Sequence, residues 1–564
     1  MAKTQAMMYW RTPKGVRRDY VDSRFGQVHY RIARPESPSA VPLMCFHPSP
    51  ISGRLYGQLL AEMGRDRIAV APDTPGFGES DAPLDAPEIA DYAAAMGEVL
   101  DSLGLGEVDV MGYHTGSKIC VELAQQRPRQ VRRLVLVSAP INTEEELARH
   151  KADYGAKEIS AEGSHLQARW DGHWKWRGPG TPLELVHREV VESLRGGTTS
   201  WWGHRASRNY QHAEYLPKVT QPVLVLCPKD DLWEATLRAR DVIRNGRLLK
   251  LPDWGHGMLD MHAKKVSTIL RNFLDAPAVD VAPSSQVPKA PPKAPLRSER
   301  AGHVRRRFID GAHGQLHLHI TEGGQGRNTP LVCLHMSPNS GRIWSALIEE
   351  IGRDRVAVAP DMPGLGESDA PQTAPEIEDY ARAVTGLIET LGLGAVDVMG
   401  YHTGSITCAE LALQRPDLVR RIVMVSAPIF TDEELMWFRE NYAATPLKED
   451  GSHIVERWRN MIGFYSSQVP AEVLYRNFAD SLRGGPVSWW GHRAAFNYPL
   501  GKRLPDVSHP ILVINPNDDL AEQTPRAVPL MQNGRIHDIP EMGHGFIDVM
   551  TPEIGALLRE FLDA

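Results

Sequence analysis

Apolar residues occur along this chain in two alternating patterns. Short, nearly unbroken apolar runs such as PLMCFH (42–47), VDVMGY (108–113) and PVLVLCP (222–228) have the length of buried β-strands. Between them lie longer stretches with helical spacing, for example EIADYAAAMGEVLDSLG (88–104). The alternation predicts an α/β fold with a mainly parallel sheet that is covered by helices on both faces.

The whole pattern is written twice. RDRIAVAPDTPGFGESDAP, which starts at Arg65, returns as RDRVAVAPDMPGLGESDAP at Arg353, and the offset of 288 also relates MGYHTGS at 111 to MGYHTGS at 399. A repeat of this length is a complete domain and not a solenoid unit. We therefore expect two tandem domains, 1–275 and 301–564, joined by a Pro/Ala-rich linker over 276–300.

A segment rich in Trp, His and Gly interrupts the alternation in each copy, at about 141–216 and about 429–504. It precedes the last strands of each domain, and we expect it to form a helical lid. The tether is long enough in the flexible-coil regime for the two domains to pack as an intramolecular pseudo-dimer, with further homo-oligomers possible.

Composition limits the classes of partner. The chain of 564 residues has 42% apolar residues and a net charge of −7, values typical of a soluble globular protein without a long basic field. We therefore expect neither nucleic acid nor a membrane as a partner. No apolar stretch has the length of a signal peptide core or a membrane span, so we expect a cytoplasmic location. No nucleotide or haem motif occurs, and we expect no organic cofactor.

The turn Gly112-Tyr113-His114-Thr115-Gly116 lies between an apolar strand and a helix. Its pattern is that of the G-x-S-x-G nucleophile elbow, with a histidine in the place of the serine. His402 has the same position in the second copy. Later in each copy, a strand ends at two adjacent aspartates, and a Gly-His-Gly motif follows near the end of the domain. These residues are Asp230, Asp231 and His256, and then Asp518, Asp519 and His544.

The chain order of elbow, acid and histidine, together with the D-x-P-G-x-G-x-S-D loop, resembles the lid-bearing α/β-hydrolases that cleave esters, epoxides, haloalkanes and carbon–carbon bonds. The resemblance covers nearly all of each copy. It implies catalytic roles for His114, Asp231 and His256 and for His402, Asp519 and His544; the second aspartate is preferred because P-K-D-D aligns with the family's G-x-x-D. It also implies oxyanion-hole donors at Ser49 and Thr115 and at Ser337 and Thr403, although Pro48 and Met336 replace the family's glycine.

A histidine at the elbow leaves three functions open. The first is a hydrolase that acts on a small apolar or aromatic carbonyl compound, such as an ester, a lactone or a carbon–carbon bond, through the His/Asp/His set. The second is a lyase or decarboxylase that uses the two histidines as acid and base. The third is a binding domain that has lost its nucleophile. His47, His114, His256 and Asp231 are also metal-ligand types, but we expect no metal, because in the resembling family the first of these histidines supports a loop.

Aromatic and basic residues of the lid are candidates for contact with a small-molecule substrate. We predict substrate-binding roles for His47, His165, Trp201, Trp202, His204 and Tyr210, and for His335, His453, Trp489, Trp490, His492 and Tyr498.

Overall fold

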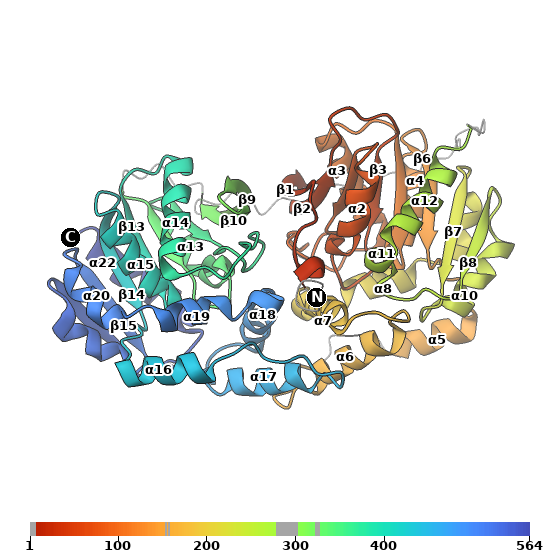
Figure 1. Cartoon of the computed structure of the whole chain (residues 1–564). Coiled ribbons are helices and arrows are strands. Elements are labelled where there is room, and N and C mark those ends of the chain that lie inside the picture. Colours follow the sequence, from red (N-terminus) through yellow and green to blue (C-terminus); the bar gives the residue numbers. More distant parts are fainter. Residues whose placement is uncertain (1–6, 153–154, 156–157, 278–302, 322–327) are drawn as a thin grey trace. The chain divides into compact units, whose positions relative to one another are not determined.

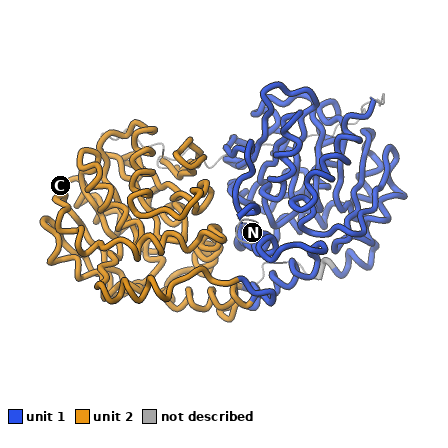
Figure 2. The backbone as a smooth tube through the Cα atoms, in the orientation of Figure 1, with its two compact units in different colours: residues 1–158, 164–297, 447–451 blue, residues 159–163, 298–446, 452–564 orange. Residues whose placement is uncertain are grey.

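The structure is a computed structural model that describes residues 7–152, 155, 158–277, 303–321 and 328–564 (Figure 1). Most of the predicted linker, residues 278–300, lies outside the described residues. The chain divides into two compact units (Figure 2). Unit 1 consists of residues 1–158, 164–297 and 447–451, and unit 2 consists of residues 159–163, 298–446 and 452–564.

Each unit contains one eight-stranded sheet, and the predicted α/β class with two tandem, mainly parallel sheets is confirmed. In unit 1 the strand order is β1-β2-β4-β3-β5-β6-β7-β8, and only β2 runs against the other strands. These strands are β1 Val16–Ser23, β2 Gly26–Ala33, β3 Leu43–Phe46, β4 Ala69–Pro72, β5 Val108–Tyr113, β6 Val131–Val137, β7 Val223–Pro228 and β8 Gly246–Leu251.

Unit 2 repeats this topology in the order β16-β15-β14-β13-β11-β12-β10-β9, with β10 antiparallel to both of its neighbours. Its strands are β9 Val304–Gly311, β10 Gly314–Thr321, β11 Leu331–Leu334, β12 Ala357–Pro360, β13 Val396–Tyr401, β14 Val419–Val425, β15 Ile511–Pro516 and β16 Gly534–Ile539.

Helices cover both faces of each sheet because successive strand residues point to opposite sides. In unit 1, Val110 and Leu134 pack in a buried cluster with residues of α3 and α4, while their neighbours Met111 and Val135 pack with residues of α2 and α12 on the other face. These helices are α2 Gly57–Met63, α3 Ile89–Ser102, α4 Thr115–Gln126 and α12 Ala263–Leu274. Their counterparts in unit 2 are α13 Ser345–Ile351, α14 Ile377–Leu391, α15 Thr403–Gln414 and α22 Thr551–Leu562. Short helices follow the seventh strand and the Gly-His-Gly motif, α10 Trp233–Leu237 and α11 Met258–Met261 in unit 1 and α21 Phe546–Val549 in unit 2.

A series of helices lies between the sixth and seventh strands of each unit, where the sequence predicts the lid. In the first repeat they are α5 Glu144–Ala152, α6 Ser164–Trp176, α7 Leu183–Leu194, α8 Trp202–Asn209 and α9 His212–Tyr215. In the second repeat they are α16 Asp432–Asn441, α17 Ser452–Ile462, α18 Ala471–Ser481, α19 Trp490–Asn497 and α20 Leu500–Arg503. None of the described helices is long and apolar enough to cross a membrane.

Each unit also includes a five-residue segment from the other repeat (Figure 2). Within unit 1, the indole N–H of Trp170 donates to the carbonyl of Glu449 at 2.8 Å. Within unit 2, the indole N–H of Trp458 donates to the carbonyls of Ser160 at 3.0 Å and Ala161 at 3.1 Å. Both tryptophans are almost completely buried, so these bonds give buried indole donors a backbone acceptor.

Candidate active site

The elbow holds its histidine in a strained backbone conformation between β5 and α4. His114 has φ 48° and ψ −111°, and His402 has φ 48° and ψ −110° between β13 and α15. The flanking glycines are required because a Cβ at Gly112 would lie 2.1 Å from the carbonyl oxygen of Gly116, and a Cβ at Gly116 would lie 2.0 Å from that of Phe46. Such strain is a common feature of functional sites. The turn places the histidine beside the aspartates that follow the seventh strand.

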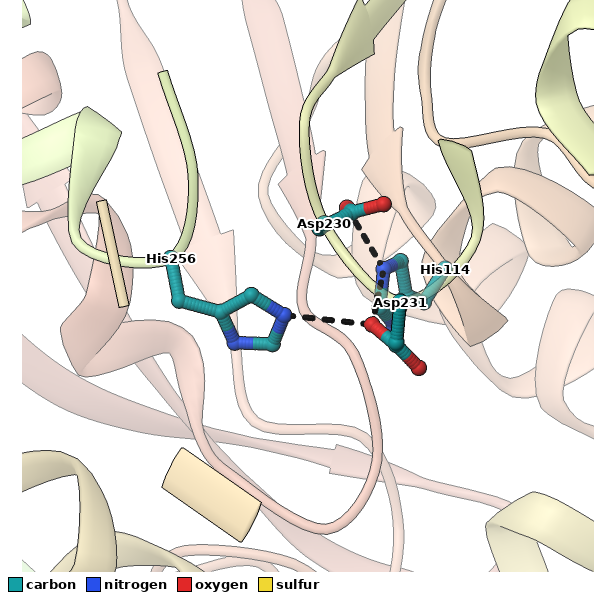
Figure 3. A group of neighbouring side chains, drawn as sticks. All are labelled: His114, Asp230, Asp231 and His256. Atoms are coloured by element: carbon teal, nitrogen blue, oxygen red, sulfur yellow. Dashed lines mark hydrogen bonds and ion pairs between the residues drawn. The ribbon is translucent and has the colours of Figure 1, made fainter. Parts of the chain in front are cut away.

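In unit 1 the two histidines pair with different aspartates (Figure 3). His114 Nε2 lies 3.0 Å from Asp230 Oδ2, and His256 Nε2 lies 3.2 Å from Asp231 Oδ1. Asp231 Oδ1 is also 3.7 Å from His114 Nε2, which joins the two pairs. The Asp230 side chain is completely buried and accepts further hydrogen bonds from Tyr113 Oη at 3.2 Å and Ser138 Oγ at 2.5 Å.

Unit 2 reproduces this arrangement with only small differences. His402 Nε2 lies 3.2 Å from Asp518 Oδ2 and 3.7 Å from Asp519 Oδ1, and His544 Nε2 lies 2.8 Å from Asp519 Oδ1. Tyr401 Oη donates to Asp518 Oδ2 at 3.1 Å and lies 3.0 Å from His544 Nδ1. We name His114, Asp230, Asp231 and His256, and the matching His402, Asp518, Asp519 and His544, the His/Asp clusters.

Opposite charges and burial shift the pKa values of these groups. Burial alone would raise the pKa of the Asp231 carboxyl, but the charge of His114 and the hydrogen bond with His256 hold it well below its usual range. Burial would lower the pKa of His256, but the Asp231 carboxylate outweighs it and raises the pKa to about 9. In unit 2, burial is likewise outweighed by Asp519 and Asp518, which raise the pKa of His402. In unit 1, the Asp231 carboxylate and the protonated form of His256 therefore stabilise each other.

The predicted acid and histidine residues thus lie in contact, since Asp231 faces His256 and Asp519 faces His544. The sequence did not reveal the role of the preceding aspartate. Because Asp230 holds the elbow histidine, the cluster contains two His–Asp pairs and not the linear relay of elbow, histidine and acid.

The predicted oxyanion-hole residues lie beside the elbow. Thr115 is the first residue of α4 and Thr403 the first residue of α15, so their amides belong to helix N-termini, which favour negative charge. Ser337 lines a pocket together with His402, and Ser49 is buried against the lid at Gly203. These positions suit donors to a developing oxyanion, and the role itself stays a prediction.

His47 and His335 are buried and support the loop after the third strand. The amide of Thr74 donates to His47 Nε2 at 2.8 Å, and His47 Nδ1 lies 3.0 Å from the carbonyl of Pro48. His335 makes the corresponding bonds to Met362 and Met336. Both ring nitrogens thus contact backbone groups, which favours a structural role, and the substrate-binding role of these two histidines stays a prediction.

A pocket of about 160 Å³ lies over the cluster in unit 2. Of the predicted residues it brings together Ser337, His402, His492, Asp519 and His544. Its other lining residues come from the third-strand loop and the lid, namely Met336, Pro338, Asn339, Arg457, Met461, Phe464, Tyr465 and Ser481. The cluster is therefore reachable from a cavity.

Several predicted lid residues lie elsewhere. Tyr210 and Tyr498 belong to the buried core clusters, where Gln125 donates to Tyr210 Oη at 3.2 Å and Tyr498 Oη donates to Glu410 at 2.5 Å. Both hydroxyls bond to buried polar groups, which favours a core-packing role, and the role as substrate anchors stays a prediction. The tryptophans Trp201, Trp202, Trp489 and Trp490 are half-buried in the lid, and the described lining of the unit 2 pocket does not include Trp489 or Trp490.

The remaining predicted histidines are in the lid. His204 is half-buried, and burial followed by the charge of Arg169 lowers its pKa to about 3. His492 lines the unit 2 pocket, and burial followed by the charge of His402 lowers its pKa to about 4. His165 is half-buried and His453 is buried, and His453 is not part of the described pocket lining.

The most informative residue that sequence reasoning missed is Arg457. It lines the unit 2 pocket and donates from Nη2 to the carbonyl of Ser481 at 2.9 Å. The described residues supply no carboxylate ion pair for it, and burial lowers its pKa. The available signal was the Arg-Trp pair, which both lids contain at 169–170 and 457–458.

Two residues near the unit 1 cluster differ from their counterparts in unit 2. At the offset of 288, His173 and Glu189 of unit 1 correspond to Met461 and Asn477 of unit 2. Both unit 1 residues lie near the cluster, because a ligand nitrogen or oxygen of each lies within 4.8 Å of one on His256.

Comparison with known proteins supports the fold assignment. The family model described as alpha/beta hydrolase fold matches residues 59–259 and 329–506. A 2-(acetamidomethylene)succinate hydrolase from Mesorhizobium japonicum is 30% identical over 267 residues, which cover 44% of this chain and 93% of that protein. An (E)-2-((N-methylformamido)methylene)succinate hydrolase from Acinetobacter baylyi is 31% identical over 102 residues, 18% of this chain and 39% of that protein.

Among solved structures, the crystal structure of an E-2-(acetamidomethylene)succinate hydrolase matches 46% of this chain and 100% of its own, at 22% identity and a TM-score of 0.38.

Proposed function

Because the chain belongs to the α/β-hydrolase fold family, we propose that it is a hydrolase whose two units each cleave a small carbonyl compound with water. The observation that carries this proposal is the His/Asp cluster, which both units repeat at the ends of the same strands. Acyl transfer to water needs acid/base groups, donors to the oxyanion and space for the substrate. The cluster, the helix N-terminus beside it and the cavity above it can supply these three features.

The elbow residue is not a serine, cysteine or aspartate, and its Nε2 is already held by Asp230. We therefore propose that the cluster activates a water molecule directly. The water oxygen bonds to the carbonyl carbon, and the water proton passes to the neutral imidazole of the elbow histidine. The leaving group takes a proton from the second histidine of the cluster as its bond to that carbon breaks. The amides of Thr115 and Thr403 would stabilise the oxyanion.

The pocket of unit 2 favours a substrate that carries a carboxylate. Arg457 has no carboxylate ion pair among the described residues, although its guanidinium lines the same cavity as His402 and Asp519. A buried cation without a counter-ion is costly unless a ligand supplies one. The names of the two relatives above, both hydrolases of succinate derivatives, agree with an acidic carbonyl substrate.

A substrate screen tests the proposal. We expect the full chain to hydrolyse at least one of a panel of carboxylated esters, lactones, enamides and β-diketones, with ¹⁸O from labelled water found in the product acid. The variant with both His114→Ala and His402→Ala should lose about 10²–10⁴-fold in rate. Equal rates for the two proteins would reject the role of the cluster, and cleavage without ¹⁸O incorporation would reject hydrolysis in favour of a lyase.

A further inference from the structure

We propose that each His/Asp cluster binds one divalent transition-metal ion, with the two histidine Nε2 atoms and one oxygen of each aspartate as ligands. In unit 1 these are His114, Asp230, Asp231 and His256, and in unit 2 His402, Asp518, Asp519 and His544. The inference deepens the proposed function, on which it rests for its catalytic meaning, because a bound ion would be the group that holds the reacting water.

The spacing of the ligand atoms suits a single ion. In each cluster, one ligand atom from each of the four residues can be chosen so that all lie within 4.8 Å of one another. Bonds of about 2.0–2.2 Å from an ion to nitrogen or oxygen place tetrahedral ligand atoms about 3.3–3.6 Å apart. The measured contacts of 3.0, 3.2 and 3.7 Å in unit 1 bracket that range. Small side-chain rotations would therefore complete the coordination.

Outer partners already orient the proposed ligands. Tyr113 and Ser138 both donate to Asp230, and Tyr401 and Ser426 both donate to Asp518. Tyr401 Oη also lies 3.0 Å from His544 Nδ1, which leaves Nε2 to face the cluster. Hydrogen-bonded ligands of this kind are the usual second layer of a metal site, where they fix the ring orientation and the tautomer.

Charge and chemistry point to the same class of ion. The two adjacent carboxylates of each cluster carry two negative charges, one of them on a completely buried side chain. A divalent cation would neutralise this pair. Two imidazoles and two carboxylates form a ligand set that suits zinc and iron(II) better than magnesium or calcium, which prefer oxygen ligands alone.

This inference replaces the sequence-based expectation of no metal. That expectation counted His47 among the possible ligands, and the structure shows both of its ring nitrogens bonded to backbone groups. Asp230, which sequence reasoning did not include, takes the fourth place.

The test is a direct measurement of metal binding to the full chain. Protein freed of metal with a chelator is dialysed against Zn²⁺ at increasing concentration, and the bound zinc is counted by elemental analysis. We expect two high-affinity ions per chain, and one per chain for the variant Asp231→Asn. For the variant with both Asp231→Asn and Asp519→Asn, the Zn²⁺ affinity of both sites should fall by at least about 10–100-fold. This is the loss seen when a residue that only hydrogen-bonds to a metal ligand is replaced, and loss of a ligand itself should cost no less.

Two controls separate binding from folding. Asp231 and Asp519 are partly exposed, so their replacement by asparagine should preserve the fold, which circular dichroism checks. Asp253→Asn changes an exposed carboxyl three residues before His256 and should leave two ions bound. The melting temperature should rise with Zn²⁺ for the wild type and not for the double variant.

The outcomes distinguish this inference from the proposed function. If the wild type binds no more zinc or iron(II) than the double aspartate variant, the metal inference is overturned, even if hydrolysis is found. If the wild type binds two ions per chain that the double variant lacks, the inference holds, even if every carbonyl substrate is refused and the proposed function fails.

Discussion

Arg457 offers a quantitative test of how unit 2 selects its substrate. Its guanidinium lines the pocket beside His402 and bonds only to Ser481 among the described residues, so a substrate carboxylate would be its ionic partner. A hydrogen bond to a charged group contributes about 1.5–3 kcal/mol. Because Arg457 is half-buried and solvent screens part of the ion pair, we take the lower half of that range, which corresponds to a factor of about 10–40.

We therefore expect Arg457→Met to lower kcat/KM for a carboxylated substrate about 10–40-fold, mainly through KM, and to leave kcat/KM for the neutral methyl ester of the same acid nearly unchanged. The assay uses the His114→Ala background so that unit 1 does not contribute. Arg459→Met is the matched control, since Arg459 is an exposed residue of the same helix, and its N–H donates to the carbonyl of Glu162. An equal loss for the acid and its ester, or no loss for either, would refute a carboxylate-binding role.

Three further predictions concern folding. Burial, followed by the charge of Arg208, lowers the pKa of Lys118 to about 7, below its unfolded value of about 10.4. Below pH 7 the buried ammonium group lowers the free energy of unfolding, and this loss disappears as the pH rises to about 10. Lys118→Met should therefore raise the melting temperature more at pH 7 than at pH 10. Trp170→Phe removes the donor to Glu449 and should lower the free energy of unfolding by about 1–3 kcal/mol in urea titrations, whereas an unchanged midpoint would show that this bond contributes nothing. Gly112→Ala should cost about 3 kcal/mol or more, because its Cβ would lie 2.1 Å from a backbone oxygen; a normal melting curve would contradict the tight elbow.

Features that follow the linear order of the chain were predictable from the sequence. The offset of 288 relates His114 to His402, and apolar runs such as 108–113 form central strands as expected. The elbow, the aspartates and the Gly-His-Gly motif were found because each follows a strand or loop with a recognisable pattern. Parallel strands bring their carboxyl ends to one edge of the sheet, so the order of the motifs was enough to bring these residues together.

Contacts between side chains were less predictable. Nothing in the pair Asp230-Asp231 shows that the first aspartate faces His114 while the second faces His256, because the choice depends on where the strained elbow directs its side chain. Tyr210 and His47 looked like polar pocket residues, but each is paired with groups that only the folded chain brings near, such as Gln125 and the amide of Thr74. The periodicity of apolar residues predicts which positions are buried, but it does not predict which group a buried polar atom will bond to.

The two units combine nearly identical clusters with different neighbouring residues, and this contrast bears on the proposed function. Distances within the clusters differ by at most 0.4 Å between corresponding pairs, while His173 and Glu189 of unit 1 are replaced by Met461 and Asn477 in unit 2. If drift alone acted on a cluster without function, its strained histidine and buried aspartate would be among the first positions to relax, because each costs stability. Retention of the costly residues beside changed neighbours supports the proposal that both clusters have a function.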